Sequence, residues 1–285
     1  MRFKKQYVLT TLQLLLGFLC LGIEQPLRIV EASVQAAEDG PVAGSAYAFM
    51  PGDSIYCSFR FAGYQAEQTT DGKKLKMSYK VRLTDKAGVM LAPEESGSVE
   101  DELSEEDRDW YPKRRAVFQL PTYITAGDAT LTISVTDLIA HTTASKILPL
   151  RLGGESLVDS GTLGIQSFHF YRSENSREAL ELAAYRPGDT VWARFFITGF
   201  KAGAKNRHDV QYGLRVLGPD GRTLLTQEPA AEDEKESFYP PRYVPGSLSL
   251  PTNADMITGL YTIVLDVRDL LGKKTSTGKY EFTLE

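Results

Sequence analysis

The sequence has few of the residues that most often carry chemistry. It has only two cysteines, Cys20 and Cys57, and its three histidines, His141, His169 and His208, occur singly. The histidines show no His-x-His or His-Glu-x-x-His spacing, so a zinc site is disfavoured. Cys20 lies in an N-terminal apolar run, so the remaining chain has one thiol and no internal disulfide. The fold must therefore be held together by its hydrophobic core.

Long basic runs are also missing. The formal net charge is -5 at pH 7, and the longest cluster of basic residues is Lys113-Arg114-Arg115. A nucleic-acid-binding surface normally needs a basic patch, so nucleic acid is not expected as a partner. The sequence has no glycine-rich phosphate loop and no Asn-x-Ser/Thr acceptor. We expect no cofactor, apart from the calcium considered below.

One long apolar run is present, at the N-terminus. Arg2, Lys4 and Lys5 precede the apolar segment from Tyr7 to Ile23, which is the layout of an export signal. We expect residues 1–22 to be a signal peptide or a retained membrane anchor, and the protein to be periplasmic or extracellular. Elsewhere the composition, with 42% hydrophobic and 24% charged residues, is that of a globular protein.

A repeated stretch organises the rest of the chain. Residues 49–64 read FMPGDSIYCSFRFAGY, and residues 185–200 read YRPGDTVWARFFITGF. Each copy has Pro-Gly-Asp, a hydroxyl residue and alternating apolar positions that end at glycine and an aromatic residue. This is typical of a tight turn followed by a half-buried strand. We expect domain 1 over residues 27–152, a linker over 153–161 and domain 2 over 162–285.

The repeat also bears on where an export signal would be cut. Aligning Phe49 with Tyr185 places residues 27–36 opposite the first predicted strand of domain 2. Cleavage after Ala36 would remove that strand, so cleavage near Gly22 is favoured. A lipoprotein is disfavoured because Leu19, which is not a small residue, precedes Cys20.

The alternating pattern predicts an all-β protein. Short apolar stripes separated by turn residues, without a helical stripe, favour two tandem immunoglobulin-like (fibronectin III-like) antiparallel β-sandwiches. In domain 2, residues 210–216 lead through Gly218-Pro219-Asp220-Gly221 into residues 223–226, which predicts a hairpin. Gly259-Leu260-Tyr261 is similar to the tyrosine corner of such sandwiches. Domain 1 has Ala129 at that position, so we expect domain 1 to be the less stable copy.

The combination of Tyr185-Arg-Pro-Gly-Asp189 with GLYTIVLDVRD at residues 259–269 resembles the tandem modules of uncharacterised exported bacterial proteins. Those modules are immunoglobulin-like or fibronectin III-like β-sandwiches. The resemblance covers nearly all of residues 27–285. It implies a fold and brings no catalytic residues.

Ser54 and Cys57 are candidate nucleophiles, but each has a simpler structural interpretation. Gly52-Asp53-Ser54 has the form of a lipase motif, but Gly188-Asp189-Thr190 occupies the same place in the second repeat. A turn explains both copies, with the aspartate accepting from backbone amides and the glycine supplying an unusual φ. Cys57 aligns with Ala193 on the apolar face, which indicates a small core residue. We expect no enzyme.

Two acidic segments that precede aromatic residues are harder to explain. Residues 94–109 lead into Trp110-Tyr111-Pro112, and residues 228–236 lead into Phe238-Tyr239-Pro240. The first interpretation is a solvated loop whose aromatic pair covers the sandwich edge. The second is partner binding through exposed aromatic residues. The third is calcium binding, which is disfavoured because Asp-x-Asp-x-Asp-Gly spacing is absent.

On the long strand of domain 2, Trp192, Arg194 and Phe196 point away from the core stripe. They form either a platform for stacking a sugar or a packing surface for the first strand (Phe168, Phe170) or for domain 1. The candidate partner-binding residues are therefore Trp110, Tyr111, Phe238, Tyr239, Trp192 and Phe196.

The functional hypothesis is a non-enzymatic, exported binding or structural protein of the cell envelope. Its expected partner is an envelope protein or a polysaccharide, and membrane contact is expected only through an uncleaved N-terminal segment. The alternative is a carbohydrate-binding or enzyme-accessory module.

Overall fold

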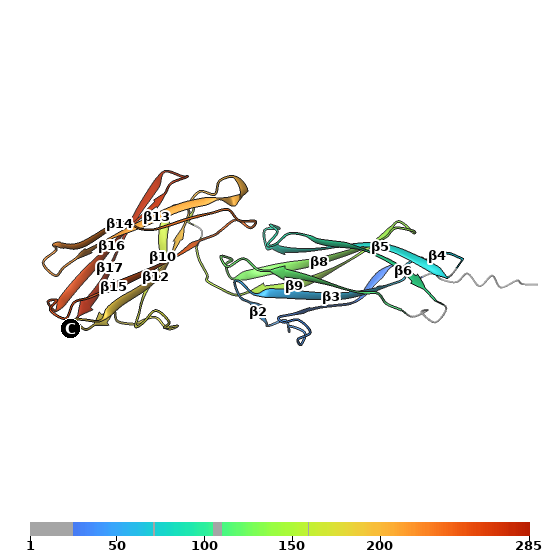
Figure 1. The fold of residues 1–285 in the computed structure, drawn as a ribbon, viewed down its shortest axis with the longest axis horizontal. Coiled ribbons are helices and arrows are strands. Elements are labelled where there is room, and N and C mark those ends of the chain that lie inside the picture. Colours follow the sequence, from blue (N-terminus) through green and yellow to red (C-terminus); the bar gives the residue numbers. More distant parts are fainter. Residues whose placement is uncertain (1–24, 71, 105–109, 159) are drawn as a thin grey trace, which may run out of the picture.

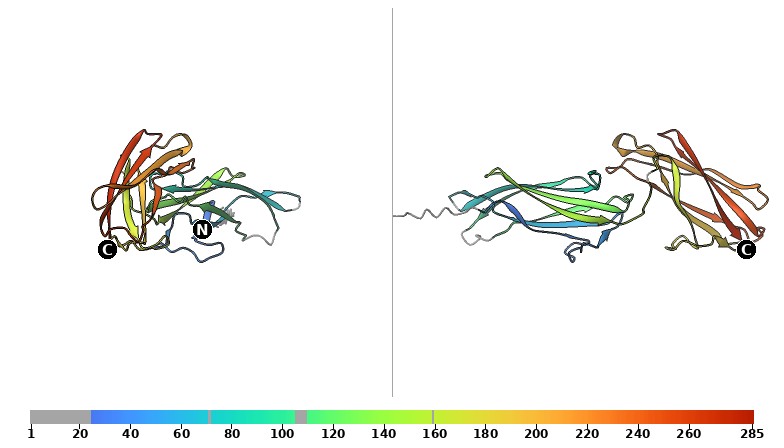
Figure 2. Two further views of the ribbon diagram at one scale, coloured as in Figure 1. Left: turned by 60° about the vertical axis from the view of Figure 1, so that its left-hand side comes forward. Right: turned by 180° about the vertical axis from the view of Figure 1, so that it is seen from behind.

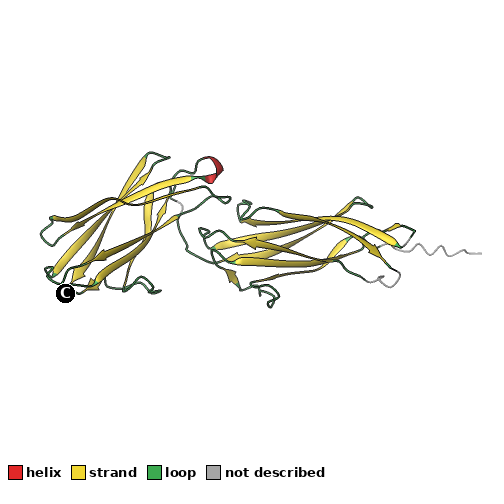
Figure 3. Ribbon diagram, viewed as in Figure 1, coloured by secondary structure: helices red, strands yellow, loops and turns green. Residues whose placement is uncertain are grey.

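The computed structural model describes residues 25–70, 72–104, 110–158 and 160–285. These residues form two β-sandwiches of mainly antiparallel strands, which lie end to end in Figure 1 and in the right-hand view of Figure 2. Among the described residues, helical structure is limited to a short 3-10 turn at Ala204–Asn206 (Figure 3). The prediction of tandem all-β sandwiches is confirmed. The predicted signal segment, residues 1–22, lies outside the described residues.

Domain 1 is built from two sheets that enclose one core. One sheet has the order β1-β3-β7, and the other has the order β2-β9-β8-β5-β4 with β6 also paired to β5. Residues 27–36 were predicted to contain the first strand, and β1 lies there. The strands are β1 (Arg28–Gln35), β2 (Ala48–Phe49), β3 (Ser54–Ala62), β4 (Glu67–Gln68), β5 (Lys73–Asp85), β6 (Glu95–Leu103), β7 (Lys113–Gln119), β8 (Gly127–Asp137) and β9 (Thr142–Leu152).

Domain 2 repeats this arrangement. One sheet has the order β10-β12-β15, and the other has the order β11-β17-β16-β13-β14. The predicted hairpin is present, because β13 pairs with β14 across the turn at residues 218–222. The strands are β10 (Gly164–Tyr171), β11 (Ala184–Tyr185), β12 (Thr190–Thr198), β13 (His208–Leu217), β14 (Thr223–Lys235), β15 (Val244–Pro251), β16 (Gly259–Asp269) and β17 (Lys274–Leu284).

The described parts of the two acidic segments lie mostly in edge strands, so the prediction that these segments are loops was wrong. Residues 95–103 form β6, and β14 continues without a break to Lys235. An edge strand pairs on one side only, so its charged side chains can remain in solvent, and charges there discourage pairing with other chains. Cations of the same sheet lie close to these carboxylates: Lys74 on the neighbouring strand β5 lies 3.4 Å from Glu100, and Arg268 on β16, two strands away, lies 2.9 Å from Glu228.

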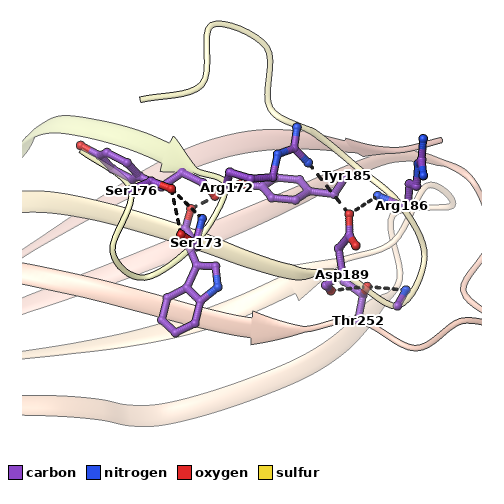
Figure 4. Close-up of polar contacts among 10 residues, drawn as sticks. Arg172, Ser173, Ser176, Tyr185, Arg186, Asp189 and Thr252 are labelled. Atoms are coloured by element: carbon purple, nitrogen blue, oxygen red, sulfur yellow. Dashed lines mark hydrogen bonds and ion pairs between the residues drawn. The ribbon is translucent and has the colours of Figure 1, made fainter. Parts of the chain in front are cut away.

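The repeated Pro-Gly-Asp segment is a turn in both domains. The amide of Met50 donates to Asp53 Oδ2 (2.8 Å), and the amide of Arg186 donates to Asp189 Oδ2 (2.9 Å). The intervening glycines have φ values of 84° and 97°. Figure 4 shows Asp189 between Arg186 and Arg172, with Thr252 beside the same turn. The turn interpretation of this motif is confirmed.

The strands that follow these turns form the centres of the two cores. Cys57 and Phe59 on β3 are buried, as are Ala193 and Phe195 on β12. Burial raises the pKa of the Cys57 thiol to about 12, because the thiolate would lose its hydration there. Cys57 is therefore a core residue, as predicted, and not a reactive nucleophile.

The tyrosine corner predicted in domain 2 is present. Tyr261 is buried, its hydroxyl donates to the carbonyl oxygen of Ile257 (2.6 Å), and its ring stacks on Phe282 at 5.4 Å. The hydroxyl therefore ties the start of β16 to the loop before it.

The Tyr261→Phe variant tests the contribution of this hydrogen bond. We expect the free energy of unfolding of domain 2 to fall by about 1 kcal/mol, because the ring is kept while one buried hydrogen bond is lost. Denaturant titration measures this change, with the exposed Tyr47→Phe as the control. Equal stability of Tyr261→Phe and the wild type would contradict the assignment.

Two buried aspartates fix loops in a way that the sequence analysis did not anticipate. Asp137 accepts hydrogen bonds from the amides of Gln65 (2.6 Å), Ile139 (2.8 Å) and Ala140 (3.0 Å). Asp269, at the matching end of β16, accepts from the amides of Lys201 (2.8 Å) and Gly272 (2.8 Å). Asp137 thus joins the loop after β3 to the turn after β8. Asp269 joins the loop after β12 to the turn after β16 in the same way.

Candidate functional site

Tyr239 does not lie on a free surface. Its side chain is only 3% exposed and belongs to the hydrophobic cluster of domain 1. Its hydroxyl donates to Asp85 Oδ2 (3.0 Å), and its ring stacks near Tyr123 with centroids 6.3 Å apart. Burial raises the pKa of this phenol, so it stays protonated at neutral pH. This predicted partner-binding residue thus contacts the other domain of its own chain.

Other residues of the same loop also contact domain 1. Arg242 lies 3.7 Å from Asp85 and 5.9 Å from the ring centroid of Tyr239. The hydroxyl of Tyr243 donates to the carbonyl oxygen of Thr122 (3.2 Å). We call residues 239–243 the docking loop. A cleft of about 500 Å³ lies beside it, lined by both domains.

The remaining aromatic residues of the acidic-aromatic segments are more accessible. Phe238 is 48% exposed, and Tyr111 is 39% exposed. Trp110 is half-buried against the core of domain 1, and its carbonyl oxygen accepts from the Tyr64 hydroxyl (2.9 Å). Tyr111 and Phe238 therefore keep side chains that a partner can reach.

The acidic residues do not form a recognisable metal site within the described part of the chain. No group of three or more His, Cys, Asp or Glu side chains there is arranged to hold a metal ion. Glu105, Glu106, Asp107 and Asp109 lie outside the described residues. Calcium binding stays a prediction for this segment.

The second candidate surface is the outer face of the β10-β12-β15 sheet. The strand register places Trp192 between Tyr171 and Ser249, and it places Arg194 between His169 and Ser247. We call Tyr171, Trp192, Arg194, Ser247 and Ser249 the platform. It combines two flat aromatic rings, one guanidinium and two exposed hydroxyls.

Local contacts hold Arg194 in place on the platform. Its guanidinium lies 4.3 Å from the ring centroid of Tyr171, and it donates to the carbonyl oxygens of Ser176 (2.9 Å) and Glu174. The hydroxyls of Ser173 and Ser176, which Figure 4 shows side by side, bond to each other (2.9 Å). The platform therefore has one edge that is fixed before any ligand arrives.

Trp192 and Phe196 share a strand face but differ in their surroundings. The ring of Phe196 packs edge-on against Tyr243 of the docking loop, with centroids 4.8 Å apart. Phe168 and Phe170 pack against each other and against core rings, as with Phe168 on Phe195 (5.7 Å). No ring contact of Trp192 is found within the described ranges. Phe196 thus serves the domain boundary, while Trp192 remains available on the platform.

No family model matches the sequence, and comparison with curated proteins finds no match. The C-terminal domain of the Streptococcus agalactiae AgI/II polypeptide BspA is similar in structure, with 9% identity and a TM-score of 0.31 over 90% of this chain and 100% of that chain.

Two further solved structures are similar at the same level. The C-terminal domain of the Streptococcus pyogenes antigen I/II-family protein AspA has 9% identity and a TM-score of 0.30, over 89% of this chain and 99% of that chain. A family 123 glycoside hydrolase from Clostridium perfringens has 11% identity and a TM-score of 0.31, over 44% of this chain and 27% of that chain. At these TM-scores the likenesses carry no functional argument.

In the part of the chain that the structure describes, no helical segment has the length and hydrophobicity of a membrane-spanning helix.

Sequence reasoning identified the aromatic residues but missed the docking role of Tyr239 and Tyr243. One difference between the repeats could have indicated it. Domain 2 has Pro240-Pro241-Arg242 after the aromatic pair, whereas domain 1 has Pro112 followed directly by its strand. The longer segment in domain 2 gives the loop enough length to reach domain 1.

Proposed function

We propose that this chain is a non-enzymatic, exported bacterial protein that binds an envelope protein or polymer through the platform of domain 2. The main support for this proposal is the pair Trp192 and Arg194. Arg194 is fixed by several contacts, while Trp192 stays half-exposed beside it. Binding hot spots are enriched in tryptophan, tyrosine and arginine, and the platform holds one of each.

The roles of the polar groups support a non-enzymatic function. Asp53 and Asp189 close turns, and Asp137 and Asp269 hold loops. The thiol of Cys57 faces the core with a pKa of about 12. A catalytic group must reach its substrate and exchange protons at working pH. The four aspartates instead hold backbone amides, and the Cys57 thiol is buried in the core.

Removal of the Trp192 side chain from the platform is expected to weaken binding to the partner without unfolding the protein. Trp192→Ala is expected to weaken binding of the full chain to isolated bacterial envelopes by at least about tenfold, because tryptophan anchors often contribute 2 kcal/mol or more. Sedimentation of purified protein with envelope fragments measures this affinity. The control is Leu182→Ala, which removes an exposed apolar side chain of domain 2 that belongs neither to the platform nor to the acidic-aromatic segments.

A carbohydrate ligand is the second candidate. The row Tyr171, Trp192 and Ser249 places two rings beside a hydroxyl on one sheet face. Aromatic rings bury the apolar faces of flat ligands, and serine hydroxyls both donate and accept hydrogen bonds. Polysaccharide chains need this combination.

Affinity electrophoresis in gels that contain polysaccharide separates the two candidates. Retardation of the wild type but not of Trp192→Ala would support a carbohydrate ligand. Binding to envelopes that is abolished by protease treatment, with no retardation in any gel, would support a protein partner. Equal envelope binding by Trp192→Ala and the wild type would contradict the platform in both versions.

A further inference from the structure

We infer that two tyrosines of domain 2 complete the corner of domain 1. Tyr239 supplies the aromatic ring and Tyr243 supplies the hydrogen bond that domain 1 lacks because it has Ala129 at the corner position. Domain 1 then reaches its full stability only while domain 2 is docked. This inference concerns the coupling between the domains and does not depend on the proposed function.

The place of the missing tyrosine follows from the strand register. In domain 2, Gly259 pairs with Leu284 and Tyr261 pairs with Phe282. In domain 1, Gly127 pairs with Leu152 and Ala129 pairs with Leu150. Where domain 2 stacks a tyrosine on a phenylalanine at 5.4 Å, domain 1 therefore has an alanine opposite a leucine. This end of domain 1 lacks two aromatic rings.

Tyr239 lies at the end of domain 1 where those rings are missing. It is buried in the same hydrophobic cluster as Ala129 and Ile124. Its hydroxyl bonds to Asp85, which is the cross-strand partner of Ala129. Asp85 is itself held, because its Oδ1 accepts from the amides of Ala87 (2.9 Å) and Val89 (2.9 Å). The receptor for the phenol is thus a fixed carboxylate on domain 1.

Tyr243 supplies the corresponding hydrogen bond. In domain 2, Tyr261 bonds to the carbonyl oxygen of Ile257, in the loop before β16. In domain 1, the loop before β8 offers the carbonyl oxygens of Thr122 and Ile124 to the hydroxyl of Tyr243, at 3.2 Å and 3.5 Å. One tyrosine acts within domain 2, and two tyrosines from domain 2 act on domain 1.

The dependence is expected to run in one direction. Domain 2 contains its own corner tyrosine and its own core cluster. The cluster of domain 1 includes Tyr239 from the other domain. A ligand that binds the folded form of a domain and not its unfolded form stabilises the folded form. The docking loop acts as such a ligand on domain 1.

Cys57 offers a probe for domain 1 alone. A full-length Cys20→Ser variant leaves Cys57 as its one thiol, and that thiol lies in the core of domain 1. A buried thiol reacts when its domain opens, so the labelling rate under native conditions follows the population of open domain 1. The substitutions Tyr239→Ala, Tyr239→Phe and Tyr243→Phe are each made in this background.

We expect Tyr239→Ala to raise the labelling rate of Cys57 by at least about 30-fold, consistent with removal of a large buried side chain. Tyr239→Phe and Tyr243→Phe keep the rings and remove only the hydrogen bonds of one hydroxyl group each, so each is expected to raise the labelling rate about fivefold. Phe238→Ala, next to the docking loop, is expected to leave the rate unchanged.

The unfolding of domain 2 is followed by the fluorescence of Trp192 in a Trp110→Phe variant, and its midpoint is expected to stay constant. Labelling of Cys57 at the wild-type rate in all three tyrosine variants would overturn the inference. So would an equal fall in the stability of both domains, because Tyr239 would then support domain 2 itself.

Discussion

Replacing Asp137 by alanine is expected to lower the free energy of unfolding of domain 1 by about 3–5 kcal/mol, because three backbone amides lose their acceptor. The amides of Gln65, Ile139 and Ala140 all point at this one buried carboxylate. No side-chain oxygen remains at that place in the variant. The loop after β3 and the turn after β8 are expected to loosen together.

Denaturant titration of the full chain in a Trp192→Phe background, with Trp110 fluorescence as the signal for domain 1, measures this loss. Asp137→Asn keeps one acceptor oxygen and is expected to lose less than Asp137→Ala. The exposed Asp128→Ala is the control and is expected to change stability by no more than about 0.5 kcal/mol. A loss for Asp137→Ala as small as that of the control would show that the loops are held by other contacts.

The Gly199→Ala variant is expected to destabilise domain 2 by about 3 kcal/mol or more. Gly199 has a φ of 72°, and an added Cβ would lie 1.9 Å from the carbonyl oxygen of Thr162. The variant therefore combines an unfavourable backbone conformation with a collision against backbone at the start of domain 2.

The Gly221→Ala variant separates these two causes. Gly221 has a φ of 77°, but an added Cβ there meets no atom within 4 Å. It is expected to cost only the conformational strain, about 1–2 kcal/mol. Thermal unfolding of both variants measures the difference. Equal losses would mean that the segment around Thr162 moves aside without cost.

The fold was predictable because its main elements appear twice. The repeated Pro-Gly-Asp turn marked the start of β3 and β12, and alternation of apolar residues marked their buried faces. The acidic stretch in β14 was misassigned, since charged residues on both faces give no alternating pattern. Only pairing with β13, a contact between distant residues, makes that stretch a strand.

The candidate site was only partly predictable for a related reason. The outward direction of Trp192 followed from period-two alternation on one strand. The cross-strand neighbours of Trp192, which are Tyr171 and Ser249, depend on the register of three strands. The burial of Tyr239 depends on how two domains meet, and no local pattern encodes that contact. The alanine at position 129 was visible as a gap, but its compensation came from another domain.

We propose that the platform is the surface of the protein that contacts the partner. The most direct test places a photo-activated cross-linking residue at position 249, next to Trp192, in the full chain expressed in its native cells. We expect a specific adduct with one envelope component, and loss of that adduct when Trp192→Ala is added. An adduct of the same yield with and without Trp192, or the same adduct from a cross-linker on the far sheet at position 277, would contradict it.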